Sequence, residues 1–99
     1  MALDAPLALD RYVVDVLMPD LVGHDGRPSA FLVYLLIEAE GEKAPLGYSA
    51  LAERTGLSRR ACQIAVAHLA RRRLIAIDRR AGNEAARFTA LRPWRERKA

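Results

Sequence analysis

Residues 49–75 constrain the fold most strongly, because their sequence predicts two helices joined at a tight corner. Ser49 is a good cap for the first helix, and Gly56 stands where a short helix must end in a left-handed residue. Ser58 can cap the second helix. Within that helix, small and aliphatic residues recur at the three-to-four-residue spacing of one buried stripe. The members of this stripe are Cys62, Ala65, Val66 and Leu69.

The opposite face of the second helix carries side chains that suit contact with DNA. Arg59 and Arg60 fall in its first turn, where backbone amides and the helix dipole favour a phosphate. Gln63 follows one turn later, and Arg or Gln can make bidentate contacts with bases in the major groove. The residues of this helix that we predict to contact DNA are Ser58, Arg59, Arg60, Gln63, Ile64, Ala67, His68 and Arg71.

Two strand-like segments, residues 74–78 and 87–91, follow the second helix and predict a hairpin. Arg79 and Arg80 would lie near its tip and could enter an adjacent minor groove. Other arginines would contact phosphates and fix the register without reading sequence. These predicted phosphate contacts are Arg71, Arg87, Arg92 and Arg95.

The N-terminal part of the chain predicts one short helix and one turn. Apolar residues in residues 9–18 recur with helical spacing, and Pro19 should end or bend that helix. Residues 20–27 contain Gly23 and an Asp-Gly pair, which are typical of turns.

Residues 28–40 predict a longer helix, framed by Pro28 at its start and Gly41 at its end. Its centre is apolar on every side, so it must be covered on more than one side. Either the N-terminal helix or a second copy of the protein should provide that cover. We expect a homodimer, and the alternative is that the same apolar residues complete a monomeric core. The residues predicted for dimerisation are Tyr12, Val13, Leu17, Met18, Phe31 and Tyr34.

The order helix, helix, helix, hairpin is that of a winged helix, and residues 46–91 resemble the winged helix-turn-helix domains of bacterial transcriptional regulators. They also resemble those of plasmid and phage replication initiators. The residues that carry the resemblance are Ser49, Leu51-Ala52-Glu53, Gly56-Leu57-Ser58-Arg59-Arg60, Cys62-Gln63, Ala65-Val66, Leu69 and Leu74-Ile75. The chain departs from the family pattern at Arg72-Arg73, where a Leu-Gly pair is usual, and at Ile64, where a polar residue is common.

The resemblance implies a mainly α fold with a small β-hairpin, and the length of 99 residues predicts a single domain over residues 1–99. Residues 1–27 would form an extra N-terminal helix and loop, residues 28–91 the winged-helix core and residues 92–99 a basic tail. Residues 58–72 would then be the recognition helix in the major groove. Residues 74–91 would be the wing, on the adjacent minor groove or backbone.

Charge is divided along the sequence in a way that agrees with a polyanionic partner. Residues 1–53 carry three basic and nine acidic side chains, whereas residues 54–99 carry thirteen basic and three acidic ones. Fourteen of the sixteen basic residues are arginine, whose planar fork suits phosphate and guanine edges. We therefore expect the C-terminal half to face DNA and the acidic half to lie away from it.

Several other classes of protein are not expected. The single cysteine, Cys62, forms no internal disulfide and fits the buried stripe. His24 and His68 are far apart in sequence, so we expect no metal site, and no nucleophile–base arrangement or cofactor motif predicts an enzyme. The longest apolar run, residues 30–37, is far short of the roughly 20 residues that cross a bilayer. With no signal-peptide pattern at the start, these features predict a cytoplasmic protein with no membrane partner.

The sequence thus predicts a small bacterial transcriptional regulator that binds double-stranded DNA as a homodimer. Any small-molecule effector would have to bind between helices or at the dimer seam. One alternative is a replication initiator module, which would bind repeated sites with the same fold. Another is a winged helix used for protein–protein interaction, in which Ile64 and Ala67 would contact a protein.

Overall fold

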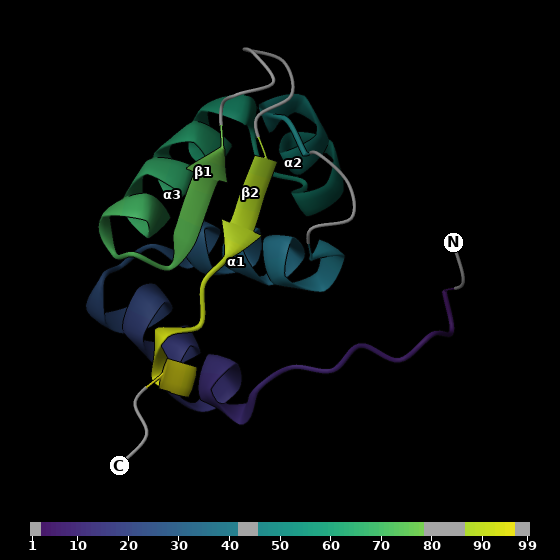
Figure 1. Ribbon diagram of the computed structural model, residues 1–99. Coiled ribbons are helices and arrows are strands. Elements are labelled where there is room, and N and C mark those ends of the chain that lie inside the picture. The colour runs from purple at the N-terminus through teal and green to yellow at the C-terminus, as the bar shows by residue number, and fades with distance from the viewer. Residues whose placement is uncertain (1–2, 42–45, 79–86, 97–99) are drawn as a thin grey trace.

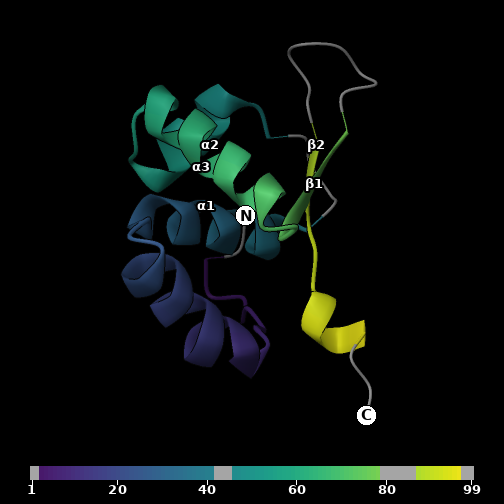
Figure 2. The ribbon, with the colours of Figure 1, turned by 90° about the vertical axis from the view of Figure 1, so that its left-hand side faces the viewer.

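Helix α1 (Pro28–Glu40) lies at the centre of the computed structural model, which describes residues 3–41, 46–78 and 87–96. Helices α2 (Tyr48–Thr55) and α3 (Arg59–Arg71) lie on one side of α1, and the N-terminal helical segment lies on the other (Figures 1 and 2). Strands β1 (Ile75–Asp78) and β2 (Arg87–Ala90) form an antiparallel hairpin beside the helices. The predicted class, mainly helical with a small hairpin, is confirmed.

The predicted frame of α1 is correct. Pro28 is its first residue, and Gly41, with φ of 65°, follows its last. One side of the helix is buried in the core through Ala30, Val33 and Ile37, together with Phe31 and Tyr34. The helix therefore supplies the apolar surface on which the other elements pack.

The corner between α2 and α3 also forms as predicted. Gly56 adopts the left-handed conformation, with φ of 82°, and its amide donates to Ala52 O at 2.9 Å. Ser58 Oγ accepts a hydrogen bond from the Ala61 amide at 3.0 Å, which caps α3. The stripe that was predicted to be buried is buried: Cys62, Ala65, Val66 and Leu69.

The predicted cap at Ser49 is wrong, because α2 begins at Tyr48 and its N-cap is Gly47, two residues before Ser49. Ser49 therefore lies inside the first turn, where its hydroxyl does not bond to the helix backbone. Instead, Ser49 Oγ accepts a hydrogen bond from Arg59 Nη1 at 2.8 Å. This bond ties the start of α2 to the start of α3.

The N-terminal helix continues through Pro19, so it does not end there as one of the two predictions had it. Its hydrogen bonds follow the wider π-type winding in η1 (Val13–Leu17) and η2 (Pro19–His24), so residues 20–24 are helical rather than a turn. Wider winding suits a proline, because the proline ring would otherwise clash with the carbonyl four residues earlier. Leu21 is fully buried and continues the stripe of Val13 and Leu17, so burial outweighs the turn chemistry of this segment.

The hairpin pairs Ile75 with Ala90 and Asp78 with Arg87, close to the predicted strand bounds. Phe88 and Ile75 face the core, and the Leu91 amide donates to Leu74 O at 2.8 Å beyond the strands. The predicted tip residues Arg79 and Arg80 lie outside the described residues.

The start of the predicted basic tail folds back against the N-terminal segment. Residues Pro93–Glu96 form a 3₁₀ turn, η3, in which Trp94 stacks on Tyr12 with ring centroids 4.5 Å apart. Trp94 Nε1 also donates to Asp10 Oδ2 at 2.7 Å. Residues 92–96 therefore join the two ends of the domain. Among the described helices, none is both long and apolar enough to cross a bilayer.

Candidate nucleic-acid interface

The exposed face of α3 carries most of the side chains predicted to contact DNA. The core stripe takes one side of the helix, so residues on the opposite side face solvent. Ile64 is 41% exposed on this side. The exposed residues of this face, which we call the α3 face, are Arg59, Arg60, Gln63, Ile64, Ala67 and Arg71.

A hollow of about 230 Å³ lies beside the α3 face, where the start of α1 approaches α3. Arg27, the N-cap of α1, and Ser29 line it from the start of α1, and Ala61 and Ile64 line it from α3. The first amides of a helix have no partner within the helix and carry a partial positive charge. The hollow therefore brings the positive end of α1 and an exposed arginine next to the α3 face.

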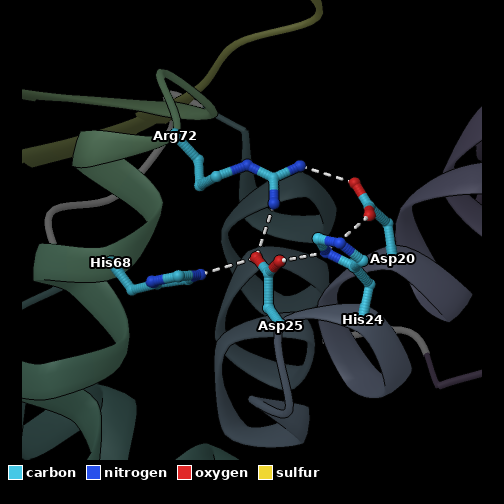
Figure 3. A network of polar contacts seen from close by, with 5 residues as sticks. All are labelled: Asp20, His24, Asp25, His68 and Arg72. Carbon is cyan, nitrogen blue, oxygen red and sulfur yellow. Dashed lines mark hydrogen bonds and ion pairs between the residues drawn. The ribbon is translucent and has the colours of Figure 1, made fainter.

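His68 differs from the other predicted DNA contacts, because its ring turns toward the N-terminal segment (Figure 3). Its Nε2 lies 2.8 Å from Asp25 Oδ2, and its side chain is only 15% exposed. The predicted DNA contact by His68 is therefore corrected: the side chain bonds to a carboxylate on the flank of α3 and does not belong to the α3 face.

Asp25 is the centre of a polar network that joins η2 to α3 (Figure 3). Arg72 donates from Nη1 to Asp25 Oδ2 and from Nη2 to Asp20 Oδ2, each at 2.5 Å. His24 Nδ1 lies 3.1 Å from Asp25 Oδ1. Hydrogen bonds from His68 and His24, together with the charge of Arg72, lower the pKa of Asp25 to about 2. The carboxylate is thus held ionised between two elements that are far apart in sequence.

This network was not predicted from the sequence, because His24 and His68 are far apart in it. A usable signal was present: Asp20 and His24 are four residues apart, as are His68 and Arg72. Each pair therefore lies on one side of its own helix, and the first pair contains a carboxylate whereas the second contains a guanidinium. That these two pairs lie next to each other in the fold could be seen only in the tertiary structure.

The residues Asp20, His24 and Asp25 place possible metal-ligand atoms within 4.8 Å of one another. The sequence alone did not predict this juxtaposition. Both carboxylates already bind the guanidinium of Arg72, which supplies the cation that such a group requires. The donor set is therefore satisfied within the chain, and we assign no metal to it.

Several cations of the C-terminal half bind carboxylates of the N-terminal half. Arg95 donates to Asp10 through two nitrogens at 2.5 and 2.6 Å, and Arg92 pairs with Glu38. Hydrogen bonds from Arg95 and Trp94 hold the pKa of Asp10 well below its usual range. The predicted phosphate contacts of Arg92 and Arg95 are therefore corrected: their charges are neutralised within the chain.

Other arginines form no ion pair within the described part of the chain, and all of them are exposed. They are Arg27, Arg59, Arg60, Arg71, Arg73 and Arg87. Three of the six belong to the α3 face, and Arg27 lines the hollow beside it. Positive charge that is not compensated internally is thus concentrated at and around α3.

Four of the residues predicted for dimerisation are already buried within one chain, namely Val13, Leu17, Phe31 and Tyr34. The N-terminal segment packs its apolar stripe on α1, so these side chains belong to the core and are not available to a second copy. Tyr12 is partly covered by Trp94, and Met18 remains 38% exposed. The predicted interface is corrected accordingly, whereas dimerisation itself stays a prediction.

Comparison of the chain with known protein families, with curated proteins and with solved structures finds no match.

Proposed function

We propose that this protein is a winged helix-turn-helix protein that binds duplex DNA, with α3 in the major groove and the β1–β2 hairpin as its wing. The observation that carries the proposal is the α3 face. It combines arginines that form no ion pair within the described residues, a glutamine and a few small or apolar side chains on one exposed side of a capped helix. Duplex DNA offers phosphates for the arginines and base edges for the glutamine.

The start of α3 supports an approach to the DNA backbone. Ser58 Oγ accepts from the Ala61 amide and can still donate its own hydrogen to a phosphate. Arg60 is exposed in the same turn, and the dipole of α3 attracts an anion to this end. Gln63, one turn further, would reach a base edge once the backbone is held.

The internal ion pairs make the proposal more specific than the sequence did. Arg72, Arg92 and Arg95 are engaged by carboxylates, so we no longer count Arg92 and Arg95 among the contacts to DNA phosphates. We assign that role to Arg60, Arg71 and Arg87, which are exposed on α3 and on the second strand of the hairpin. Arg79 and Arg80 remain predicted wing contacts.

The role that we propose for DNA binding is transcriptional regulation by a homodimer, in the cytoplasm of a bacterium. A replication initiator module would use the same surface. A protein-interaction module is the alternative from another class, and the 41% exposure of Ile64 in the middle of the α3 face favours it.

The test is selection of bound duplexes from a random DNA library at fixed moderate salt. We expect enrichment of an inverted repeat, and we expect the double variant Arg59→Ala, Arg60→Ala to lose it. The control is Arg11→Ala, which removes one exposed charge from the N-terminal segment. Enriched direct repeats would favour the initiator alternative. Absence of any enrichment, together with capture of a protein partner that survives the double substitution, would favour the interaction module and contradict DNA binding.

A further inference from the structure

The outermost line of helix α3 differs from the rest of the α3 face, because it is cationic at its ends and apolar at its centre. Arg60, Ile64, Ala67 and Arg71 follow the spacing i, i+4, i+7 and i+11, which places them in one line on the side opposite the buried stripe. All four residues are exposed. We call these four residues the α3 midline.

The two flanks of the α3 midline are not equally open. Gln63 is exposed on one flank. On the other flank, His68 bonds to Asp25, so the end of η2 lies against that side of α3. A partner that approaches α3 therefore meets the midline and the flank of Gln63.

Neither the core nor the helix itself accounts for an isoleucine at the centre of the midline. The core is formed by the buried stripe, which includes the adjacent Ala65, whereas Ile64 is 41% exposed. Isoleucine is also a weaker helix former than the alanine or arginine at the neighbouring midline positions. A branched apolar side chain at this place gains free energy when a partner removes it from water.

The major groove of duplex DNA has the same order of charged and apolar groups as the midline. Phosphates form its rims, and its floor presents base edges, among which the 5-methyl group of thymine is apolar. Arg60 and Arg71 are eleven residues apart. That separation is about 16 Å along a helix axis, and the groove is about 12 Å wide. The arginines can therefore reach phosphates while the residues between them face the floor.

The cations at both ends of the midline favour this groove over an apolar protein surface as the partner. An apolar surface that covered the whole midline would take the guanidinium groups of Arg60 and Arg71 out of water without a partner, which is costly. Phosphates supply the opposite charge at both ends and leave the centre free to contact a methyl group.

We propose that Ile64, with Ala67 beside it, recognises thymine through its 5-methyl group, so that the DNA site has a T·A pair under the middle of α3. This inference rests on the proposed function and deepens it by naming a base that α3 reads. It assigns apolar readout to Ile64, next to the hydrogen-bond readout expected of Gln63. The family that this chain resembles commonly has a polar residue at the position of Ile64, so this readout would distinguish the chain from that pattern.

The test replaces thymine by deoxyuridine, which removes the 5-methyl group and keeps the base pair. Each thymine of the duplex selected from the random library is replaced singly, and affinity is measured by competition at fixed salt. We expect a loss of about fourfold at the position under Ile64, as for one buried methyl group. Ile64→Ala should bind the thymine duplex more weakly than the wild type and should not distinguish thymine from deoxyuridine at that position.

The matched control is Val14→Ala, since Val14 lies on the N-terminal segment and is 42% exposed, much as Ile64 is. It should keep the wild-type sensitivity to deoxyuridine. Circular dichroism should show the same helix content in both variants, because each loses an exposed side chain.

Two results would overturn this inference and leave DNA binding intact. One is a wild type that binds a selected duplex and is insensitive to deoxyuridine at every thymine. The other is a loss on deoxyuridine substitution that is equally large in Ile64→Ala. If the library yields no enriched duplex, sequence-specific DNA binding and this inference are both overturned. Capture of a protein partner that Ile64→Ala no longer binds would then assign the centre of the midline to a protein contact.

Discussion

Asp25 makes more of the polar contacts between η2 and α3 than any neighbouring residue, and its side chain is only 9% exposed. It accepts hydrogen bonds from His68 and Arg72, both of which come from the α3 end of the fold. A carboxylate in this position stabilises the native state. Without it, His68 and Arg72 would be partly buried with no group of opposite charge to accept their hydrogen bonds. Asp25 therefore sets how η2 and α3 are held together.

The substitution Asp25→Asn should lower the free energy of unfolding by about 1–2 kcal/mol, since it removes the charge and leaves both partners in place. Urea unfolding measures this loss. The control is Asp15→Asn, because Asp15 pairs with Arg11 at a site where both side chains are at least half exposed. Such a surface pair contributes roughly 0–1 kcal/mol. Equal losses in the two variants would contradict the role of the network.

The same residue should make stability depend on pH in acid. Its folded pKa of about 2 lies below the ordinary value of 3.8, so the unfolded chain binds more protons between these two values. Stability contributed by Asp25 is thus complete above about pH 4 and is lost as the pH falls toward 2. Urea unfolding across this window should show a steeper loss for the wild type than for Asp25→Asn. Parallel curves would show that Asp25 is not held ionised.

Gln63 is the residue of the α3 face that we expect to read a base. Replacement by Ala should relax the preference at one base pair by roughly 1–3 kcal/mol if the amide makes a bidentate contact. Competition binding with duplexes that vary one position at a time measures this. Arg60→Ala, one turn earlier, should instead weaken binding to all of these duplexes about equally. An unchanged base profile in Gln63→Ala would remove this residue from direct readout.

Among the elements, the α2–α3 corner follows from local chemistry alone. Gly56 has φ of 82°, which L side chains rarely adopt, and an added Cβ there would meet nothing within 4 Å. The cost of a side chain at this position is therefore a backbone cost. Gly23 lies inside the helical η2 without a positive φ, and an added Cβ there would also meet nothing within 4 Å.

Replacement by Ala at these two glycines should change the free energy of unfolding in opposite directions. Gly56→Ala should destabilise the protein by about 1–2 kcal/mol, because it forces an L residue into the left-handed region. Gly23→Ala should stabilise it by roughly 0.5–1 kcal/mol, because it reduces the freedom of the unfolded chain at a helical position. Thermal and urea unfolding of both variants provide the comparison. A stabilising Gly56→Ala would contradict the corner geometry described here.

The elements that could be predicted from sequence are those whose signals lie within a few residues. The glycine corner, the Ser58 cap and the stripe of α3 are of this kind, as is the Pro-to-Gly frame of α1. The helix through Pro19 could not be predicted, because Pro19 and Gly23 suggest a turn and only the burial of Leu21 against α1 decides otherwise. The candidate site was likewise predicted on α3 but not on its flank, since His68 meets Asp25 across 43 residues.

At the scale of the whole molecule, the division of charge along the sequence does not become a simple division in space. Acidic residues of the first half bind Arg72, Arg92 and Arg95 of the second half, so these cations stabilise the fold. The net charge of the C-terminal half therefore overstates how much positive charge faces a partner. What remains exposed and uncompensated in the described part of the chain lies around α3.

Arg71 and Arg72 distinguish these two uses of arginine, because they are adjacent in sequence and differ in environment. Arg71 is exposed and forms no ion pair within the described residues, whereas Arg72 binds Asp20 and Asp25. Each phosphate contact contributes about 0.9 to the slope of log affinity against log salt concentration. If α3 binds DNA as proposed, Arg71→Ala should reduce the magnitude of that slope by about that amount and leave the free energy of unfolding unchanged. Arg72→Ala should lower the free energy of unfolding and leave the slope unchanged.

Salt titrations of DNA affinity, paired with urea unfolding of both variants, separate the two effects. Equal slopes in Arg71→Ala and the wild type would mean that Arg71 contacts no phosphate. A reduced slope in a fully folded Arg72→Ala would mean that its ion pairs open when DNA binds.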